Sequence, residues 1–373
     1  MIKLLHLGDL HLDSPFKSLP YNESVKMREN IRKVFSHALR YAREERCDIV
    51  LISGDLFDRE FYSAKTLSFL VDSFRNMPEC RFVISPGNHD PYKYFGAYMS
   101  EELPENVTVF KNESVECVEY NDIGVTVYGY AFTSDSYEDH PLSVFSVKDR
   151  DRFNVLCAHA DTDDARSKYA TVTSDELLAS GLDYAALGHI HTKPEIMKSG
   201  GTVYAYSGCL AGRDFTEYGE KGGILVTLDG KNDKKSVKAK RVTFCPWVYE
   251  TVRVDVSGCM STSDISERAK DAILALPDND NEYIIKIELN GMLGFDNDTE
   301  KLMSELFSFG VKQIEDKTVI SPDFESLEND YSIRGEFYRK LRPMIESNDS
   351  NERKIASQAL RYGLMALDGA DIK

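Results

Sequence analysis

The residues Ile2-Lys3-Leu4-Leu5-His6-Leu7-Gly8-Asp9-Leu10-His11 open the chain and decide its fold. The apolar run from Ile2 to Leu7 predicts a short buried strand that ends at a glycine and an aspartate. Side chains alternate along extended backbone, so we expect Asp9 and His11 to point the same way. A carboxylate and an imidazole placed in this manner can share one metal cation.

Four further motifs each follow an apolar run of the same kind. They are Gly54-Asp55-Leu56-Phe57-Asp58, Gly87-Asn88-His89-Asp90, His159 and Gly188-His189-Ile190-His191. Amphipathic segments over residues 25–46 and 64–76, with apolar residues at helical spacing, separate the first three runs. This β-α-β-α-β order predicts an α/β fold, a two-sheet sandwich flanked by helices. In such folds the chemistry gathers at the carboxyl ends of the strands.

The donor atoms of these motifs indicate a particular class of metal ion. Mixed nitrogen and oxygen ligands suit Mn²⁺, Fe²⁺ or Zn²⁺ better than Mg²⁺ or Ca²⁺, which favour oxygen alone. An aspartate shared by two such ions holds them about 3.5–4 Å apart, the spacing used for in-line phosphoryl displacement. Each motif alone has a plainer interpretation as a turn or as a core histidine. Together, in this order and at strand ends, they favour a two-metal phosphoesterase.

The remaining sequence predicts two additional parts beyond a catalytic domain over residues 1–245. Residues 246–321 show a strand-helix-strand-helix-strand pattern, which predicts a small α+β domain. Residues 322–373 are predicted to be an acidic linker, over 322–330, and a helical tail. The tail consists of two helices split near Asn348-Asp349-Ser350-Asn351 and is a candidate partner-binding region.

Composition sets limits on location and partners. The chain has 373 residues, a formal charge of −17 and a pI near 5.0, a balance that by itself disfavours nucleic acid. Seven scattered cysteines without a CxxC pair predict reduced, buried thiols and a cytoplasmic location. We expect no signal peptide and no membrane span, since no apolar run approaches the roughly 18 residues that a span needs.

The five motifs resemble those of calcineurin-like metallophosphoesterases, over roughly residues 1–230. Within that group, the segment from Leu7 to Phe16 is similar to the SbcD-type DNA repair exonucleases, particularly their bacterial YhaO-like branch. A second similarity to these exonucleases begins at Ser207-Gly208-Cys209-Leu210 and continues through Arg213, Phe215, Glu217 and Lys221-Gly222-Gly223. In that family the α+β unit matches the place of a capping domain, and the tail matches the place where an ATPase partner binds.

The resemblance implies a role for each motif residue. Metal ligands would be Asp9, His11 and His191 for one ion, Asn88, His159 and His189 for the other, and Asp55 as the bridge between them. The nucleophile would be a water molecule activated by two divalent ions, with Mn²⁺ favoured and Fe²⁺ or Zn²⁺ as alternatives. The catalytic His89 would protonate the leaving oxygen or stabilise its charge, and Asp90 would orient His89.

The motifs leave the substrate open. The resemblance implies hydrolysis of DNA ends together with an SbcC-like ATPase, and a possible homodimer. Basic residues over 231–241 and along the tail could contact DNA, or could simply be solvated faces. The apolar stripe of the tail could pack on its own domain or take a partner's coiled coil. Two alternatives remain, namely a phosphodiesterase or phosphatase for small phosphate esters, and a non-catalytic scaffold that binds DNA ends.

Overall fold

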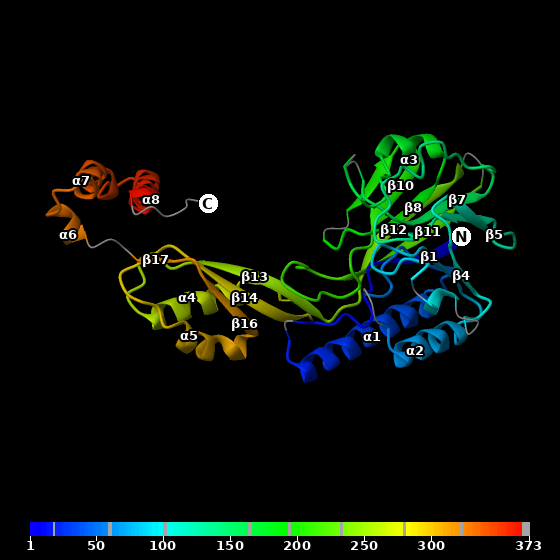
Figure 1. Ribbon diagram of the computed structural model, residues 1–373, viewed down its shortest axis with the longest axis horizontal. Coiled ribbons are helices and arrows are strands. Elements are labelled where there is room, and N and C mark those ends of the chain that lie inside the picture. Colours follow the sequence, from blue (N-terminus) through cyan, green and yellow to red (C-terminus); the bar gives the residue numbers. More distant parts are fainter. Residues whose placement is uncertain are drawn as a thin grey trace. The chain divides into compact units, whose positions relative to one another are not determined.

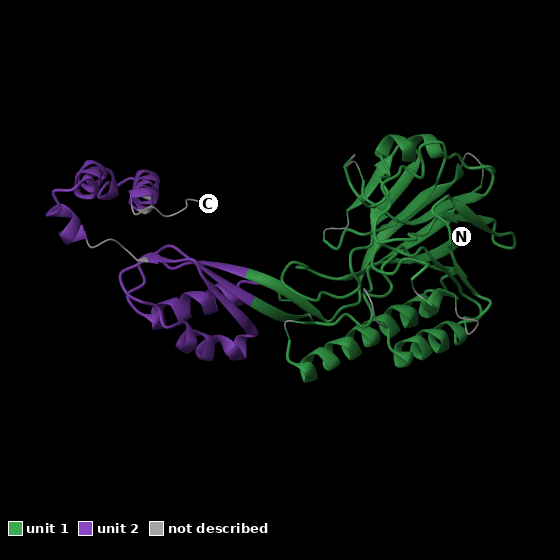
Figure 2. Cartoon of the chain, in the orientation of Figure 1, with its two compact units in different colours: residues 1–251, 278–285 green, residues 252–277, 286–373 purple. Residues whose placement is uncertain are grey.

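The computed structural model describes most of the chain and divides it into two compact units. The described residues are 1–17, 19–58, 62–94, 96–99, 103–162, 166–192, 195–231, 234–278, 281–320 and 324–367. Figure 2 shows the two units, which comprise residues 1–251 with 278–285, and residues 252–277 with 286–373.

Two sheets form the centre of the first unit (Figure 1). The order of the first sheet is β12-β11-β1-β2-β3-β4, and that of the second is β5-β6-β7-β8-β10-β9. The strands of the first sheet are β1 Ile2–Leu7, β2 Ile49–Ile52, β3 Arg81–Ile84, β4 Val107–Val109, β11 Gly222–Asp229 and β12 Ser236–Thr243. Those of the second are β5 Glu116–Tyr120, β6 Val125–Gly129, β7 Phe153–His159, β8 Tyr184–Gly188, β9 Ile196–Ser199 and β10 Thr202–Tyr206.

Alternation along the strands distributes their side chains between separate cores. Leu4 belongs to the core between the two sheets, together with Val127 and Val155 of the second sheet. Its neighbour Leu5 belongs to the core on the opposite face of the first sheet. That face is covered by two helices, α1 Tyr21–Glu44 and α2 Ala64–Arg75. The predicted two-sheet α/β sandwich flanked by helices is therefore confirmed.

Strand direction brings the motif-bearing strand ends together. In the first sheet β1, β2 and β3 run parallel to one another. In the second sheet β6, β7, β8 and β10 are likewise parallel. The short helix α3, Ser174–Ser180, contributes to a third core on the outer face of this second sheet. Parallel strands place their carboxyl ends at one edge of each sheet, which is where all five motifs begin.

The α+β pattern predicted after the catalytic domain is present. Strands β13 Trp247–Asp255, β14 Glu282–Asn290 and β16 Val311–Asp316 form a three-stranded sheet. Its helices are α4 Thr262–Leu274 and α5 Thr299–Leu306, and they contact one another. Two further strands of this region, β15 Met292–Leu293 and β17 Val319–Ile320, pair in a separate two-stranded sheet. The early residues of β13 and β14 belong to the first compact unit and the later ones to the second.

The tail contains the two predicted helices, α7 Ile333–Ile345 and α8 Ser350–Leu367. Within the segment predicted as an acidic linker over 322–330, Phe324–Glu328 form a further short helix, α6, which the sequence pattern did not indicate. Residues 321–323 lie outside the described part. Helix α6 forms because Leu327 packs with Tyr338, Leu360 and Leu364 in a small core of the tail. Much of the apolar stripe therefore packs on itself.

The structure also bears on membrane-spanning helices and on the state of the cysteines. Within the described ranges, no helix is both long and apolar enough to cross a membrane. All seven cysteines are free thiols. Six of them are buried as predicted, and Cys117 is exposed.

Candidate metal centre

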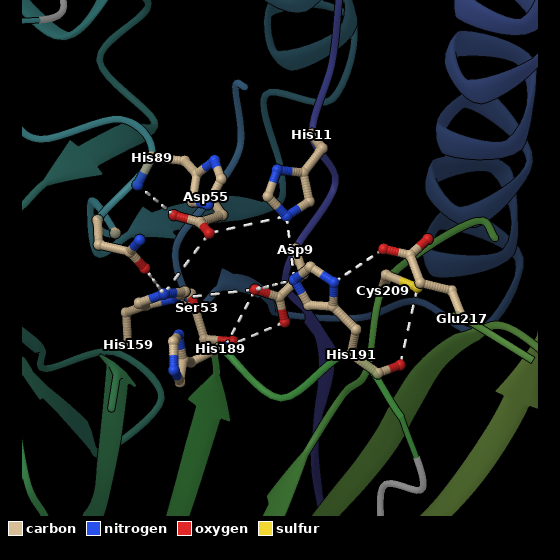
Figure 3. A network of polar contacts seen from close by, with 12 residues as sticks. Asp9, His11, Ser53, Asp55, His89, His159, His189, His191, Cys209 and Glu217 are labelled. Carbon is tan, nitrogen blue, oxygen red and sulfur yellow. Dashed lines mark hydrogen bonds and ion pairs between the residues drawn. The ribbon is translucent and has the colours of Figure 1, made fainter. Parts of the chain in front are cut away.

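Both sheets supply side chains to one cluster, which Figure 3 shows from close by. Asp9 follows β1 and Asp55 follows β2, both in the first sheet. His159 ends β7 and His189 follows β8, both in the second sheet. The strand ends therefore place residues that lie up to 180 positions apart within hydrogen-bonding reach of one another.

Asp9, His11, Asp55 and His191 form the most compact part of this cluster. Nε2 of His11 lies 3.1 Å from Nε2 of His191 and 3.7 Å from Oδ2 of Asp55. Nε2 of His191 lies 3.7 Å from Oδ1 of Asp9. One donor atom from each of the four residues lies within 4.8 Å of the other three. Two carboxylates and two imidazoles at this spacing are a suitable donor set for a divalent transition metal ion.

Asn88 and His159 meet beside the same aspartate. Nδ1 of His159 lies 3.1 Å from the carbonyl oxygen of Ser53, so Nδ1 carries the proton and donates it. Nε2 of His159 then presents a lone pair 2.8 Å from Oδ1 of Asn88 and 3.6 Å from Oδ2 of Asp55. Three acceptor atoms that face one another in a buried position fit a cation, since a cation satisfies all three together.

His189 is held close to this second group of ligands mainly through its backbone. Its amide donates to both carboxylate oxygens of Asp9, at 3.0 and 3.1 Å. Its ring lies against the rings of His159 and Tyr169, with centroid distances of 5.1 and 4.5 Å. Nε2 of His189 lies 3.7 Å from Oδ1 of Asp161. The structure thus places the predicted ligand His189 beside His159, with Asp161 as a neighbour that the sequence did not indicate.

Burial shapes the electrostatics of the ligands. Burial raises the pKa of Asp9 above its ordinary value and lowers the pKa of His11 well below its own. Nδ1 of His11 is also buried with no hydrogen-bond partner among the described residues. A buried carboxylate and a neutral imidazole at one site are both stabilised by a metal ion, which supplies positive charge without a proton.

His89 is oriented by an aspartate, although a different one from that expected. Nδ1 of His89 lies 2.9 Å from Oδ1 of Asp58, which follows β2 in the same motif as Asp55. Asp90 instead accepts from the amides of Gly87 and Phe57, at 2.7 and 3.1 Å, and from the hydroxyl of Tyr98. Asp90 therefore supports the backbone of the loop that carries His89, and Asp58 contacts its ring.

Two residues that the motifs did not single out complete the site. Oε1 of Glu217 lies 2.8 Å from Nδ1 of His191, which fixes the ring so that Nε2 faces Asp9. Arg213 binds Glu217 through Nη2 at 2.6 Å and Asp58 through Nη1 at 3.3 Å. Burial raises the pKa of Asp58, but hydrogen bonds from His89 and Ser14 and the charge of Arg213 outweigh it and hold that pKa at about 2.

The backbone at the site adopts a conformation that few residues tolerate. Asp9, His11, Asp55 and His189 have positive φ angles of 49°, 46°, 49° and 104°. Aspartate and histidine are among the residue types enriched in this left-handed region. Gly54 has a φ of 91°, and a Cβ atom there would lie 2.2 Å from Nδ1 of His159. The glycine is thus required both by the turn and by the close approach of the imidazole.

Comparison with known proteins agrees with this geometry. A family model described as calcineurin-like phosphoesterase matches residues 2–193. The chain is 27% identical over 300 residues to an uncharacterized metallophosphoesterase, YhaO, of Bacillus subtilis, covering 78% of this chain and 72% of the relative. It is 27% identical over 260 residues to the DNA double-strand break repair protein Mre11 of Saccharolobus solfataricus, covering 68% of this chain and 66% of the relative.

A solved structure is also similar. A dimetal phosphatase from Danio rerio aligns with a TM-score of 0.41 and 11% identity, over 65% of this chain and 99% of that one. The family model spans 192 residues, which is more than half of the chain, and it includes every predicted ligand and His89. The protein is therefore a phosphoesterase, and it belongs to the calcineurin-like phosphoesterase family.

Proposed function

We propose that this chain is a Mn²⁺-dependent exonuclease that hydrolyses phosphodiester bonds at DNA ends and works in DNA repair with an SbcC-like ATPase subunit. The observation that carries the proposal is the length of the match to Mre11. It extends over 260 residues, whereas the family model spans 192, so the likeness goes beyond the catalytic region common to the family.

The described donors fit two divalent ions. Metal ligands in this proposal are Asp9, His11 and His191 on one side, Asn88, His159 and His189 on the other, and Asp55 between them. When bound, such ions polarise phosphate oxygens and lower the pKa of water toward neutrality. The mixture of imidazole, amide and carboxylate donors favours Mn²⁺ and is compatible with Fe²⁺ or Zn²⁺.

His89 supplies the proton transfer in this scheme. Asp58 holds its Nδ1, so Nε2 is the nitrogen that meets the leaving oxygen. The side chain of His89 is 30% exposed, whereas those of the ligands His11 and His159 are fully buried. Exposure allows His89 to reach a substrate, and a positioned general acid contributes about 10²–10⁴-fold to the rate.

The β12 edge offers a surface for the DNA backbone. Lys238 and Lys240 on β12 are exposed and form no ion pair with any described residue. Two arginines of the tail, by contrast, are already in ion pairs, since Arg339 pairs with Glu336 and Arg342 pairs with Glu328 and Glu346. Phosphates are attracted to unpaired lysines rather than to neutralised pairs. We therefore place DNA contacts on β12 in preference to the tail.

The tail keeps apolar residues on its surface and is the proposed docking site for the ATPase. Ile333 on α7 is 70% exposed and Ile355 on α8 is 62% exposed, although Leu360 and Leu364 on α8 are buried. An apolar face of this kind suits a helix or coiled coil of a partner. A homodimer stays a prediction from the resemblance.

The decisive experiment compares two substrates with and without Mn²⁺. Purified protein should release nucleotides from end-labelled duplex DNA, and His89→Ala should lose that activity while keeping its bound metal. His140→Ala is the matched control, since His140 pairs with Glu176 away from the cluster. Hydrolysis of bis(p-nitrophenyl) phosphate without cleavage of DNA would support the small-substrate alternative. Binding of DNA ends with neither activity would support the scaffold.

A further inference from the structure

We propose that Arg213 is a positioning residue that couples the proton donor His89 to the metal ligand His191. The coupling runs through the two carboxylates on which these imidazoles rest. The inference depends on the proposed roles of His89 and His191, and it adds a residue to which neither the motifs nor the family match gives a role. Figure 3 shows Glu217 beside His191 and, across the cluster, His89.

The contacts form one continuous chain of hydrogen bonds. Oδ1 of Asp58 lies 2.9 Å from Nδ1 of His89, and its other oxygen, Oδ2, lies 3.3 Å from Nη1 of Arg213. Nη2 and Nε of Arg213 lie 2.6 and 3.1 Å from Oε1 of Glu217. The same Oε1 lies 2.8 Å from Nδ1 of His191. One guanidinium group therefore contacts the orienting partner of each imidazole.

The hydrogen-bonded residues are buried, and their burial restricts which residue can stand at position 213. The side chains of Arg213, Asp58 and Glu217 are 16%, 14% and 5% exposed. Two carboxylates at this depth repel one another unless a cation lies between them. The guanidinium keeps its charge at any working pH and donates several bonds in a fixed plane. A lysine would supply the charge, but its single ammonium group cannot hold the same planar fork.

The loop around Arg213 is itself held in place. The amide of Arg213 donates to Oε2 of Glu217 at 2.8 Å, so the two residues close a compact loop. The indole nitrogen of Trp247 donates to the carbonyl oxygen of Gly212 at 2.9 Å. Phe215 packs edge-on against Tyr249, with ring centroids 5.1 Å apart. The guanidinium therefore projects from a fixed backbone, as a positioning residue must.

The coupling predicts a distinct kinetic signature. Loss of Arg213 should weaken the orientation of His89. A poorly placed general acid lowers the rate of hydrolysis most for substrates with poor leaving groups. It should also loosen His191, so that metal is bound less tightly. Residues that orient ligands typically contribute about 10–100-fold to affinity or activity. A merely structural arginine would lower stability without changing the dependence on the leaving group.

The test measures kcat with Mn²⁺ on two diesters, one with a nitrophenolate and one with an alkoxide leaving group. In Arg213→Gln, we expect activity on the alkoxide diester to fall about 10–100-fold and activity on the nitrophenyl diester to fall several-fold less. Bound Mn²⁺ should decrease. Arg213→Lys should be intermediate, which also covers the case in which the glutamine variant does not fold. In a His89→Ala background, Arg213→Gln should no longer change the leaving-group ratio.

Arg152→Gln is the matched control. Arg152 donates to Thr126, to Asn121 and to the carbonyl oxygen of Val125. It precedes the first residue of β7, whereas the ligand His159 is the last residue of that strand, so Arg152 lies at the opposite end from the site. Its removal should lower thermal stability and leave the ratio unchanged. An unchanged ratio in both Arg213 variants, or an equal shift in the His89→Ala background, would overturn the proposal. A shifted ratio in an enzyme that does not cleave DNA would refute the exonuclease function alone.

Discussion

Asp58 and His89 share a hydrogen bond of 2.9 Å between Oδ1 and Nδ1, while the other oxygen of Asp58 accepts from Ser14 at 2.7 Å. The carboxylate is therefore held from two sides and keeps the proton of His89 on Nδ1. A general acid that donates from Nε2 while Nδ1 is bonded to Asp58 must carry a proton on both ring nitrogens. We expect Asp58→Asn to reduce kcat on DNA by about 10–100-fold, because a neutral amide stabilises that charged imidazolium less than a carboxylate does.

Measuring the bound metal distinguishes two roles for Asp58, namely orienting His89 and binding a metal ion. Oδ1 of Asp58 also lies 3.9 Å from Nδ1 of His11, so Asp58 is close to the cluster without belonging to its proposed ligands. Mn²⁺ bound to Asp58→Asn should equal that of the wild type by elemental analysis. The surface variant Asp72→Asn serves as the control. Parallel loss of metal and activity would make Asp58 a ligand.

Two glycines with positive φ angles allow backbone strain to be separated from damage to the site. Gly54 has a φ of 91° and faces His159, whereas Gly124 has a φ of 67° and open space where a Cβ would lie. Alanine at either position should cost roughly 1–2 kcal/mol of stability through left-handed strain. Only Gly54→Ala should also lose metal and activity, because its Cβ displaces the imidazole. Full activity in Gly54→Ala would contradict the placement of His159.

His6 predicts a dependence of stability on pH. Burial is the main cause that lowers its pKa to about 3, and its ring contacts Tyr184 and Ser53 at 2.9 and 3.0 Å. In the unfolded chain histidine titrates near 6.5. Below that pH the unfolded state gains a proton that the folded state does not bind. Stability from this group is therefore complete above about pH 7 and is lost as pH falls from 6.5 toward 3.

Urea unfolding at several pH values checks the contribution of His6. The free energy of unfolding should fall by up to about 1.4 kcal/mol for each pH unit below 6.5 through this residue. His6→Gln, which carries no titrating group, should be less stable at pH 7.5 but should lack this part of the slope. Identical slopes for the two proteins would show that His6 does not titrate in this way.

Substitutions of Leu360 and Ile355 test which apolar residues of the tail support its core and which are free on its surface. Leu360 is fully buried with Leu327 and Tyr338, so Leu360→Ala should destabilise the tail by about 2–5 kcal/mol. Ile355 is 62% exposed, and Ile355→Ala should change stability by less than about 0.5 kcal/mol. Hydrogen exchange over residues 333–367 would measure both. Faster exchange in Ile355→Ala would mean that its side chain supports the tail core.

The fold was predictable because local patterns encode it. The apolar run from Ile2 to Leu7 predicted a buried strand, and Leu4 and Leu5 of that strand do face different cores. The order of strand-end motifs likewise indicated which residues meet. Helix α6 was missed because acidic residues suggested a linker, although Phe324 and Leu327 stand three positions apart, as residues on one helical face do.

The orienting residues of the site were harder to predict, for a physical reason. Arg213 contacts Asp58, which is 155 positions away, and no local pattern reports such a contact. Asp58 and Asp90 are both aspartates close to a predicted motif residue. Only the path of the backbone shows that Asp58 reaches the ring of His89 while Asp90 binds amides of its loop. Both Arg213 and Glu217 lay within a recognised stretch, yet the pattern alone gave them no role.

The left-handed turns at Asp9, His11 and Asp55 have a consequence for protein engineering. A graft of these two motifs onto another sandwich would transfer the donor atoms but not the φ angles that aim them. Asparagine, which also tolerates this conformation, would be the replacement of choice for Asp9 or Asp55 in an inactive, folded variant. β-Branched residues would be the worst choice. A designer who wishes to transplant this centre must therefore build the turns first and add the ligands afterwards.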